Sequence, residues 1–159
     1  MVKVRPLAGI DEARLCAQMM CSTEPWITIG RTFDESLAMM QDAAREIYVA
    51  EDDGRVAGFI ILNMRGAFVG YIQTVCVDAN ARGGGIGTQL VQFAEERIFR
   101  DVPNVFLCVS SFNPRARKLY ERLGYEFIGE LKDYLIRGES EFLMRKTIGP
   151  LRDNAQRRT

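Results

Sequence analysis

Apolar positions recur with a helical spacing in two early segments of the chain. The first predicted helix follows Asp11, whose carboxylate is a suitable N-cap. The second follows Thr32-Phe33-Asp34-Glu35, which has the form of a capping box. The apolar stripes comprise Ala13, Cys16, Met19 and Met20 in the first helix and Phe33, Leu37, Met40 and Ala44 in the second. Both stripes indicate helices that pack one face against a core.

Strand-like apolar runs flank these helices and are joined by turn signals. Residues 2–5 fit a short strand before the first helix, and residues 46–51, 55–64 and 68–77 fit three longer strands. Asp52-Asp53-Gly54 contains the Asp-Gly pair that favours a tight hairpin. We therefore expect the three longer strands to form an antiparallel meander.

Helical spacing returns after a cluster of glycines. The apolar residues between Ile86 and Ile98 have helical period, and residues 104–109 fit a buried strand. Asn113-Pro114 fits an N-cap followed by proline at the first helical position, and Gly124 fits the left-handed residue after that helix. Residues 125–131 and 141–146 complete the pattern as two strands.

The resulting order, β-α-α-β-β-β-α-β-α-β-β, predicts an α/β fold. It corresponds to a mixed, largely antiparallel sheet of six to seven strands flanked by four helices. A chain of 159 residues buries enough surface for one core, so we expect one domain over residues 1–149. A polar tail should follow over 150–159.

Charge and hydropathy narrow the class of protein. Lys+Arg and Asp+Glu both number 21, so no global positive field draws the chain to nucleic acid or to an anionic membrane. No run approaches the roughly 20 apolar residues of a membrane span, and the amino terminus lacks the apolar run of a signal peptide. We expect a cytoplasmic protein without nucleic-acid or membrane partners, and a homodimer is compatible with the sequence.

The lack of histidine restricts the chemistry of any active site. It excludes Ser-His-Asp and Cys-His triads and the common histidine metal ligands, so proton transfer must use carboxylate, tyrosine, cysteine, lysine or water. The four cysteines show no CxxC spacing, and three of them lie in apolar stretches, where cysteine packs as a small hydrophobe. We expect neither a disulfide nor a metal site.

Arg82-Gly83-Gly84-Gly85-Ile86-Gly87 lies between a predicted strand and a predicted helix. Free N–H groups at a helix start bind phosphate, and glycines let a pyrophosphate approach the backbone. The segment has no Gly-Lys-Ser/Thr of a P-loop and lacks the third glycine of a dinucleotide fingerprint. A flexible turn before an amphipathic helix is the alternative that the glycines alone leave open.

Together with Val75-Cys76-Val77, this segment resembles the acetyl-CoA motif Q/R-x-x-G-x-G/A of the GNAT superfamily of N-acetyltransferases. The stretch from Asn113 to Tyr125 is similar to the same superfamily's N-x-x-A-x-x-L-Y-x-x-x-G-F/Y helix. The resemblance covers roughly residues 2–147 and is strongest over 69–128. It implies an acetyl-CoA-dependent N-acetyltransferase, with acetyl-CoA as co-substrate and without a metal.

The resemblance also implies which residues bind the co-substrate. Val75, Cys76 and Val77 would pair their backbone with the pantetheine arm, as an added strand pairs with an open sheet edge. Asn113 would contact the cofactor near its thioester, and a plain helix cap is an equally compatible role. The pyrophosphate would be held by Arg82, Gly83, Gly84, Gly85, Ile86, Gly87 and Thr88.

Tyr120 matches the superfamily's tyrosine that protonates the departing sulfur of CoA, a role suited to a hydroxyl with a pKa of about 10. Packing in the helix stripe is its alternative. By the same resemblance, the Val77 N–H would stabilise the carbonyl oxygen. The enzymes that acetylate ribosomal-protein amino termini carry a fifth-strand glutamate where this chain has Cys108, a poor base if buried. Glu24 would then act as base through water, or simply be solvated at the surface.

The acceptor amine is the open part of the resemblance. The last two strands are nearest in pattern to the ribosomal-protein alanine N-acetyltransferases, which implies a peptide or protein N-terminus in a cleft lined by Trp26 and Tyr134. A small-molecule amine is the alternative, attracted by Glu24, Asp133 and Glu139. A CoA-binding regulatory module without turnover is a third, consistent with the missing fifth-strand glutamate.

Overall fold

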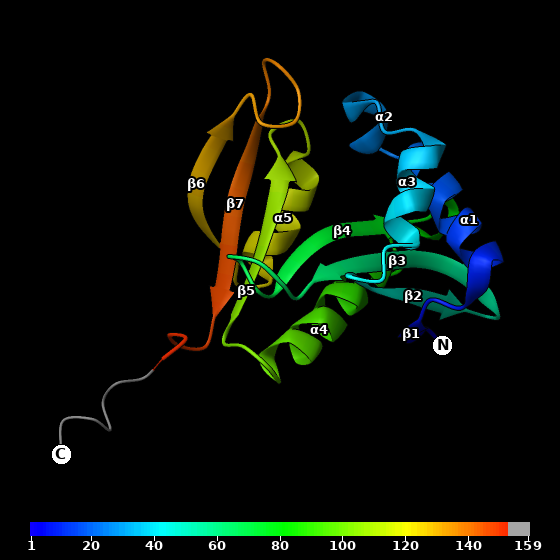
Figure 1. The fold of residues 1–159 in the computed structure, drawn as a ribbon, viewed down its shortest axis with the longest axis horizontal. Helices are drawn as coiled ribbons and strands as arrows, with labels where there is room; N and C mark the ends of the chain where they lie inside the picture. Colours follow the sequence, from blue (N-terminus) through cyan, green and yellow to red (C-terminus); the bar gives the residue numbers. More distant parts are fainter. Residues whose placement is uncertain (153–159) are drawn as a thin grey trace.

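The computed structural model describes residues 1–152, which form seven strands and five α-helices (Figure 1). In chain order these are β1 (Lys3–Pro6), α1 (Gly9–Cys21), α2 (Trp26–Ile29), α3 (Phe33–Met40), β2 (Glu46–Asp52), β3 (Arg55–Asn63), β4 (Tyr71–Val77), a 3₁₀ turn (Ala79–Ala81), α4 (Ile86–Phe99), β5 (Asn104–Ser110), α5 (Pro114–Arg122), β6 (Glu126–Lys132) and β7 (Ser140–Thr147). The predicted α/β class is confirmed. The predicted tail, 150–159, lies mostly outside the described residues.

Local sequence signals fix several element ends as expected. The Thr32 hydroxyl accepts a hydrogen bond from the Glu35 N–H at 3.1 Å, and the Glu35 carboxylate accepts one from the Thr32 N–H at 2.9 Å. This is the predicted capping box. Between β2 and β3, Asp53 and Gly54 both have positive φ, 46° and 77°, as a tight hairpin turn requires. These signals work because the residues involved are sequence neighbours.

The prediction that Asp11 caps the first helix is wrong. α1 begins at Gly9, with Ala8 at the N-cap position and Asp11 already inside the first turn. The Glu12 carboxylate instead accepts a hydrogen bond from the Ala8 N–H at 2.8 Å and binds the Arg5 guanidinium at 2.6 Å. A contact with strand β1 therefore determines where the helix starts.

The connection between α1 and α3 contains a helix that the sequence pattern does not reveal. α2 is a single turn, too short to show a periodicity, and Gly30 ends it with a φ of 79°. Trp26 at its start is buried against α1 and β3. Residues 1–152 therefore contain five α-helices rather than the predicted four.

The strand order of the sheet is β1-β2-β3-β4-β5-β7-β6, and every neighbouring pair except β4 and β5 is antiparallel. β4 and β5 are parallel and pair only at Tyr71 with Phe106 and Ile72 with Leu107. Beyond these pairs the two strands diverge, and Figure 1 shows β4 and β5 running in different directions. The sheet thus splits into two halves, β1–β4 and β5–β7.

A β-bulge in β4 lies at the point of separation. Ile61 of β3 pairs with Thr74, and the next residue, Leu62, pairs with Ile72, so Gln73 has no partner on β3. An extra residue of this kind bends its strand and reverses the faces of the side chains that follow. β4 therefore bends immediately after its last pair with β5.

Two apolar cores cover the opposite faces of the sheet. α1, α2 and α3 pack over Phe59, whereas α4 and α5 pack over the neighbouring residue Ile60. The bulge changes the face to which β4 side chains point: Ile72 belongs to the α4 core, but Cys76 belongs to the α1 core. Residues after Gln73 are thus placed on faces that simple alternation from Ile72 does not predict.

Gly70 determines how closely the first residues of β4 and β5 approach. Its φ is +87°, its carbonyl accepts a hydrogen bond from the Phe106 N–H at 3.0 Å, and an added Cβ would lie 2.5 Å from the Asn104 carbonyl oxygen and 2.7 Å from Ile98.

Gly70→Ala should lower the free energy of unfolding by about 1–3 kcal/mol more than Gly66→Ala, the usual cost of overpacking. Gly66 has a φ of +90° but nothing within 4 Å of an added Cβ, so it controls for backbone strain alone. Urea unfolding measures both, and equal losses would contradict this role.

Candidate active site

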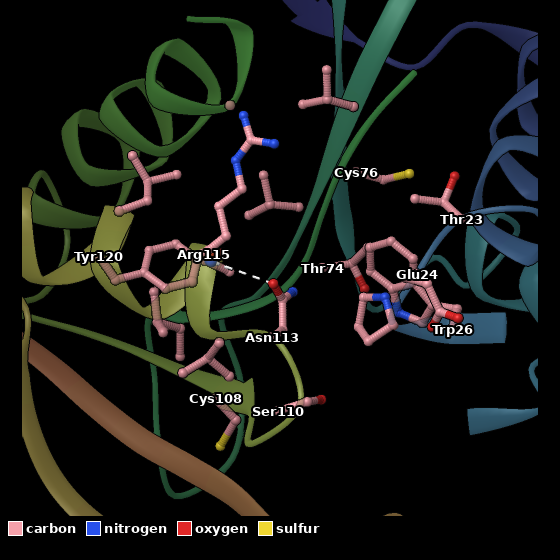
Figure 2. A pocket seen from close by; sticks show the side chains of 18 of the residues that line it. Thr23, Glu24, Trp26, Thr74, Cys76, Cys108, Ser110, Asn113, Arg115 and Tyr120 are labelled. Carbon is pink, nitrogen blue, oxygen red and sulfur yellow. Dashed lines mark hydrogen bonds between the residues drawn. The ribbon is translucent and has the colours of Figure 1, made fainter. Parts of the chain in front are cut away.

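A cleft of about 900 Å³ opens where β4 and β5 separate. Residues from both strands, α5, the glycine segment before α4, the α1–α3 connection and the β6–β7 loop line it. Figure 2 shows part of this lining from close by. The lining includes every predicted site residue except Gly84: Glu24, Trp26, Val75, Cys76, Val77, Arg82, Gly83, Gly85, Ile86, Gly87, Thr88, Asn113, Tyr120 and Tyr134.

The glycine segment leaves the N-terminus of α4 accessible. Gly83 and Gly85 have φ values of 86° and 79°, in the left-handed region that favours glycine. Gly85 is the N-cap, and no side chain caps the helix. The first N–H groups of α4 therefore remain available to an anion. Arg82 and Arg115 line the same cleft, and Figure 2 shows Arg115 extending from α5 toward α4, so this region suits a pyrophosphate.

The cleft-facing edge of β4 has no strand partner after Ile72. Val75 and Val77 pack against the α4 core, and Cys76 is buried in the α1 core on the other face. Packing thus fixes the side chains of this segment on both faces, while its edge toward β5 stays unpaired. An extended arm that carries amides, such as pantetheine, fits there as an added strand.

α5 brings Tyr120 to the cleft. The helix starts as predicted, with Pro114 in its first turn and the Asn113 side chain accepting a hydrogen bond from the Ala116 N–H at 3.3 Å. The Tyr120 ring packs edge-on against Tyr125, with 5.8 Å between ring centroids. Burial raises the pKa of Tyr120 to about 12. Its hydroxyl therefore stays protonated through the neutral range and has a proton to donate.

Glu24 and Trp26 lie across the cleft from Tyr120 (Figure 2). The Glu24 carboxylate accepts hydrogen bonds from the Thr28 N–H at 3.2 Å and from the Thr28 hydroxyl at 2.7 Å, so it stabilises α2 as well as lining the cleft. Trp26 is buried in the α1 core, whereas Tyr134 in the β6–β7 loop is 62% exposed. Trp26 is therefore a fixed wall, and Tyr134 is a solvent-facing one.

The sequence pattern does not reveal two further polar residues of the cleft, Glu141 and Ser110. They are register partners on β7 and β5, and the Ser110 hydroxyl donates a hydrogen bond to the Glu141 carboxylate at 2.5 Å. Both are buried, at 4% and 5% exposure. Burial raises the pKa of Glu141, and the weaker opposing effect of the Ser110 hydrogen bond does not reverse this. Glu141 starts a predicted strand, and nothing in the adjacent residues distinguishes it from a solvated strand end.

Cys108 stands on β5, two residues before Ser110. Burial raises the pKa of its thiol, as expected, while a hydrogen bond with Tyr71 acts in the opposite direction and the charge of Glu141 adds to the rise. The thiol is therefore a poor proton acceptor at neutral pH.

Within residues 1–152, no three His, Cys, Asp or Glu side chains gather as a metal site requires. The four cysteines are free thiols. In the same range, no helix is both long enough and apolar enough to cross a membrane.

Comparison with known proteins identifies the family. Residues 13–125 match the Acetyltransferase (GNAT) family. The chain is 34% identical over 134 residues to the S-(2-succino)cysteine N-acetyltransferase of Bacillus subtilis, an alignment that covers 76% of this chain and 81% of that protein. It is 32% identical over 111 residues to an N-alpha-acetyltransferase of Sulfurisphaera tokodaii, covering 61% of this chain and 66% of the relative.

The fold is also similar to that of a solved acetyltransferase structure. The crystal structure of an aminoglycoside 6'-N-acetyltransferase complexed with coenzyme A superposes with a TM-score of 0.74 at 20% identity, covering 96% of this chain and 99% of that one. The family match includes β4, the glycine segment and all of α5, which are among the elements that line the cleft, and it ends before the β6–β7 loop. Because the motifs, the fold and the cleft agree, we conclude that this chain belongs to the GNAT family and is an N-acetyltransferase that uses acetyl-CoA as co-substrate.

Proposed function

We propose that this enzyme acetylates the primary amine of a small molecule that carries a further positive charge. The supporting observation is a group of three carboxylates on the side of the cleft away from α4: Glu24 before α2, Glu139 in the β6–β7 loop and Glu141 in β7. Arg31 lines the same side, so the excess charge there is negative. Such a cleft concentrates cations. The similarity to an enzyme of S-(2-succino)cysteine supports a small molecule rather than a polymer as acceptor.

For the co-substrate, we assign the pantetheine arm to the open edge of Val75, Cys76 and Val77. The pyrophosphate is assigned to the segment from Arg82 to Thr88, and Asn113 to the neighbourhood of the thioester. The free edge of β4 and the uncapped start of α4 support these assignments. Backbone groups make most of the contacts assigned to the pantetheine arm and the pyrophosphate, and the Arg82 side chain adds a positive charge beside the pyrophosphate.

The reaction joins the amine nitrogen to the acetyl carbon and breaks the bond from that carbon to sulfur. The entering ammonium group loses one proton before attack and a second one as the amide forms. In this proposal Tyr120 gives a proton to the departing sulfur and regains one from the nitrogen, so one proton is released in total. The Val77 N–H is assigned to the carbonyl oxygen, whose charge increases during attack.

A peptide or protein N-terminus is the second candidate acceptor. Trp26 and Tyr134 both line the cleft, and aromatic walls suit an extended peptide or an apolar side chain. The similarity to an N-alpha-acetyltransferase also favours this acceptor. The link to the ribosomal-protein alanine enzymes rests on sequence pattern alone.

The pyrophosphate assignment predicts a loss of ligand stabilisation in Gly85→Val. At 100 times its dissociation constant, CoA should add about 2.7 kcal/mol to the wild-type free energy of unfolding and raise the melting temperature. The variant should lose most of that shift, because a branched side chain at a φ of 79° displaces the backbone that binds phosphate. Gly66→Val is the matched control, since Gly66 also has positive φ and lies outside the cleft lining. A normal shift in Gly85→Val would rule the assignment out.

The assignment of Tyr120 as general acid predicts that Tyr120→Phe lowers kcat by roughly 10²–10⁴-fold while CoA affinity changes little. Tyr125→Phe is the control, because it removes the hydroxyl of the adjacent packed ring, which does not line the cleft. Stopped assays of CoA release measure kcat in the two variants. Wild-type turnover in Tyr120→Phe would mean that the ring only fills space.

The acceptor assignment predicts that spermidine and other polyamines give a higher kcat/KM than neutral amines, Ala- or Ser-initiated peptides or S-(2-succino)cysteine. Glu139→Gln should lower kcat/KM for the polyamines by roughly 2- to 5-fold, as expected for one partly exposed charge pair. Glu130→Gln is the control. Glu130 lies on the exposed strand β6, accepts a hydrogen bond from Ser140 of β7 and does not line the cleft. A peptide with the highest kcat/KM would favour the second candidate, and S-(2-succino)cysteine with the highest value would refute the charge argument.

A further inference from the structure

Glu141 reaches the cleft from a strand that carries none of the family motifs. β7 is the neighbour of β5 on the side away from β4, and Glu141 pairs with Ser110, the last residue of β5. Both residues line the cleft although both are nearly inaccessible to solvent. Because Glu141 is one of the lining residues, we infer that the small exposed part of its side chain borders the cleft.

The face on which Glu141 lies is that of the acceptor. Leu107 and Val109 of β5 point into the core under α4 and α5, so Cys108 and Ser110 point to the opposite face. Tyr71 of β4 contacts Cys108 from the same side, and the charge of Glu141 is felt by both. Figure 2 shows Cys108 and Ser110 on the wall of the cleft below Asn113.

We propose that Glu141 is the group that takes the proton from the acceptor amine. This assignment rests on the acetyl transfer proposed above but not on the choice of acceptor. The Glu141 carboxylate accepts one proton from the ammonium group, the nitrogen lone pair then attacks the acetyl carbon, and the carboxyl group returns its proton to solvent before the next cycle. The Ser110 hydroxyl is a positioning residue, because its hydrogen bond holds the carboxylate on the acceptor face.

The other titratable groups of the cleft are less suited to this step. Glu24 is exposed and already accepts two hydrogen bonds from Thr28, and Glu139 is hydrogen bonded by the Ser111 hydroxyl. Cys108 is seldom ionised at neutral pH, as described above. Glu141 alone among the three carboxylates combines burial with a place in the sheet. Burial moves the pKa of a carboxyl group toward neutral pH, where a general base is most effective.

Within residues 1–152, no lysine or arginine forms an ion pair with Glu141, and burial and the Ser110 hydrogen bond set the direction of its pKa. Ser110 and Cys108 face it from β5, Tyr71 from β4, and the apolar Leu131 pairs with it on β6. Burial raises the pKa values of both the Cys108 thiol and the Tyr71 hydroxyl, so these groups are neutral when Glu141 ionises. The pH dependence of turnover therefore reports Glu141 itself.

The test is the pH profile of kcat in Glu141→Gln, a substitution that keeps the shape of the side chain and its contact with Ser110. We expect kcat to fall by about 10²–10⁴-fold. In the wild type, log kcat should rise with pH and level off above the pKa of Glu141. In the variant it should keep rising toward the pKa of the amine, because only amine that is already neutral can react. A variant with wild-type kcat and the same plateau would overturn the proposal.

Ser110→Ala gives an independent readout. It removes the hydrogen bond that opposes the rise in the Glu141 pKa, so the plateau should begin at a higher pH while remaining reachable. A plateau that starts at the wild-type pH would also contradict the assignment. Both variants are assayed with whichever amine of the acceptor panel gives the highest kcat/KM. A wrong acceptor class would thus appear in the wild-type panel, and a wrong base only in the variants.

Urea unfolding over a range of pH tests whether Glu141→Gln folds and whether folding raises the pKa of Glu141. Because the folded pKa is raised, the contribution of Glu141 to stability is complete below its unfolded pKa and is lost as pH rises through the folded pKa. Glu141→Gln lacks this loss, so its stability relative to the wild type should increase with pH over that window. A constant difference would mean that folding does not raise the pKa of Glu141, and the burial argument for the proposal would fail.

Discussion

The parallel contact between β4 and β5 extends over only two residue pairs. The position of every functional group depends on the divergence of the two strands after those pairs. Gly70 lets the two strands approach closely at their first residues, and the bulge at Gln73 bends β4 away directly afterwards. A continuous pairing would satisfy the edge of β4 with β5 and leave no room between the strands. The interruption gives up ladder hydrogen bonds and leaves an unpaired edge, which a ligand with its own amides can satisfy.

The same bulge divides the cleft between two faces of the sheet. Before it, Ile72 points under α4. After it, Val75 and Val77 take that direction, and Cys76 points to the α1 side. The face with α4 and α5 therefore carries the glycine segment and Tyr120, and the face with α1, α2 and the β6–β7 loop carries the carboxylates. Two substrates can then meet in the gap from opposite sides, with the acid on one side and the proposed base on the other.

Burial controls the protonation states of Tyr120 and Glu141 in ways that suit their proposed roles. Desolvation disfavours the charged form, so it keeps the Tyr120 hydroxyl protonated and makes the Glu141 carboxylate more ready to take a proton. It also makes Glu141 unfavourable for stability once it ionises, since the folded state must then hold a buried charge with a serine hydroxyl as its hydrogen-bond donor. A buried carboxylate without a cation is a costly arrangement, which is more common at functional sites than in ordinary cores.

The sequence by itself determined the features that depend on near neighbours. The capping box at Thr32, the Asp53-Gly54 turn, the Asn113 cap and the glycine segment each act within a few residues, and two of them coincide with family motifs that identify the co-substrate. The tertiary structure decided what depends on distant partners. Arg5 and Glu12 set the start of α1 in place of Asp11, packing of Trp26 accompanies α2, and the bulge sets the faces of β4. Glu141 is the clearest case. Its burial and its place at the cleft follow from pairing with Ser110, 31 positions earlier in the chain, and no local pattern can encode a register between two such strands.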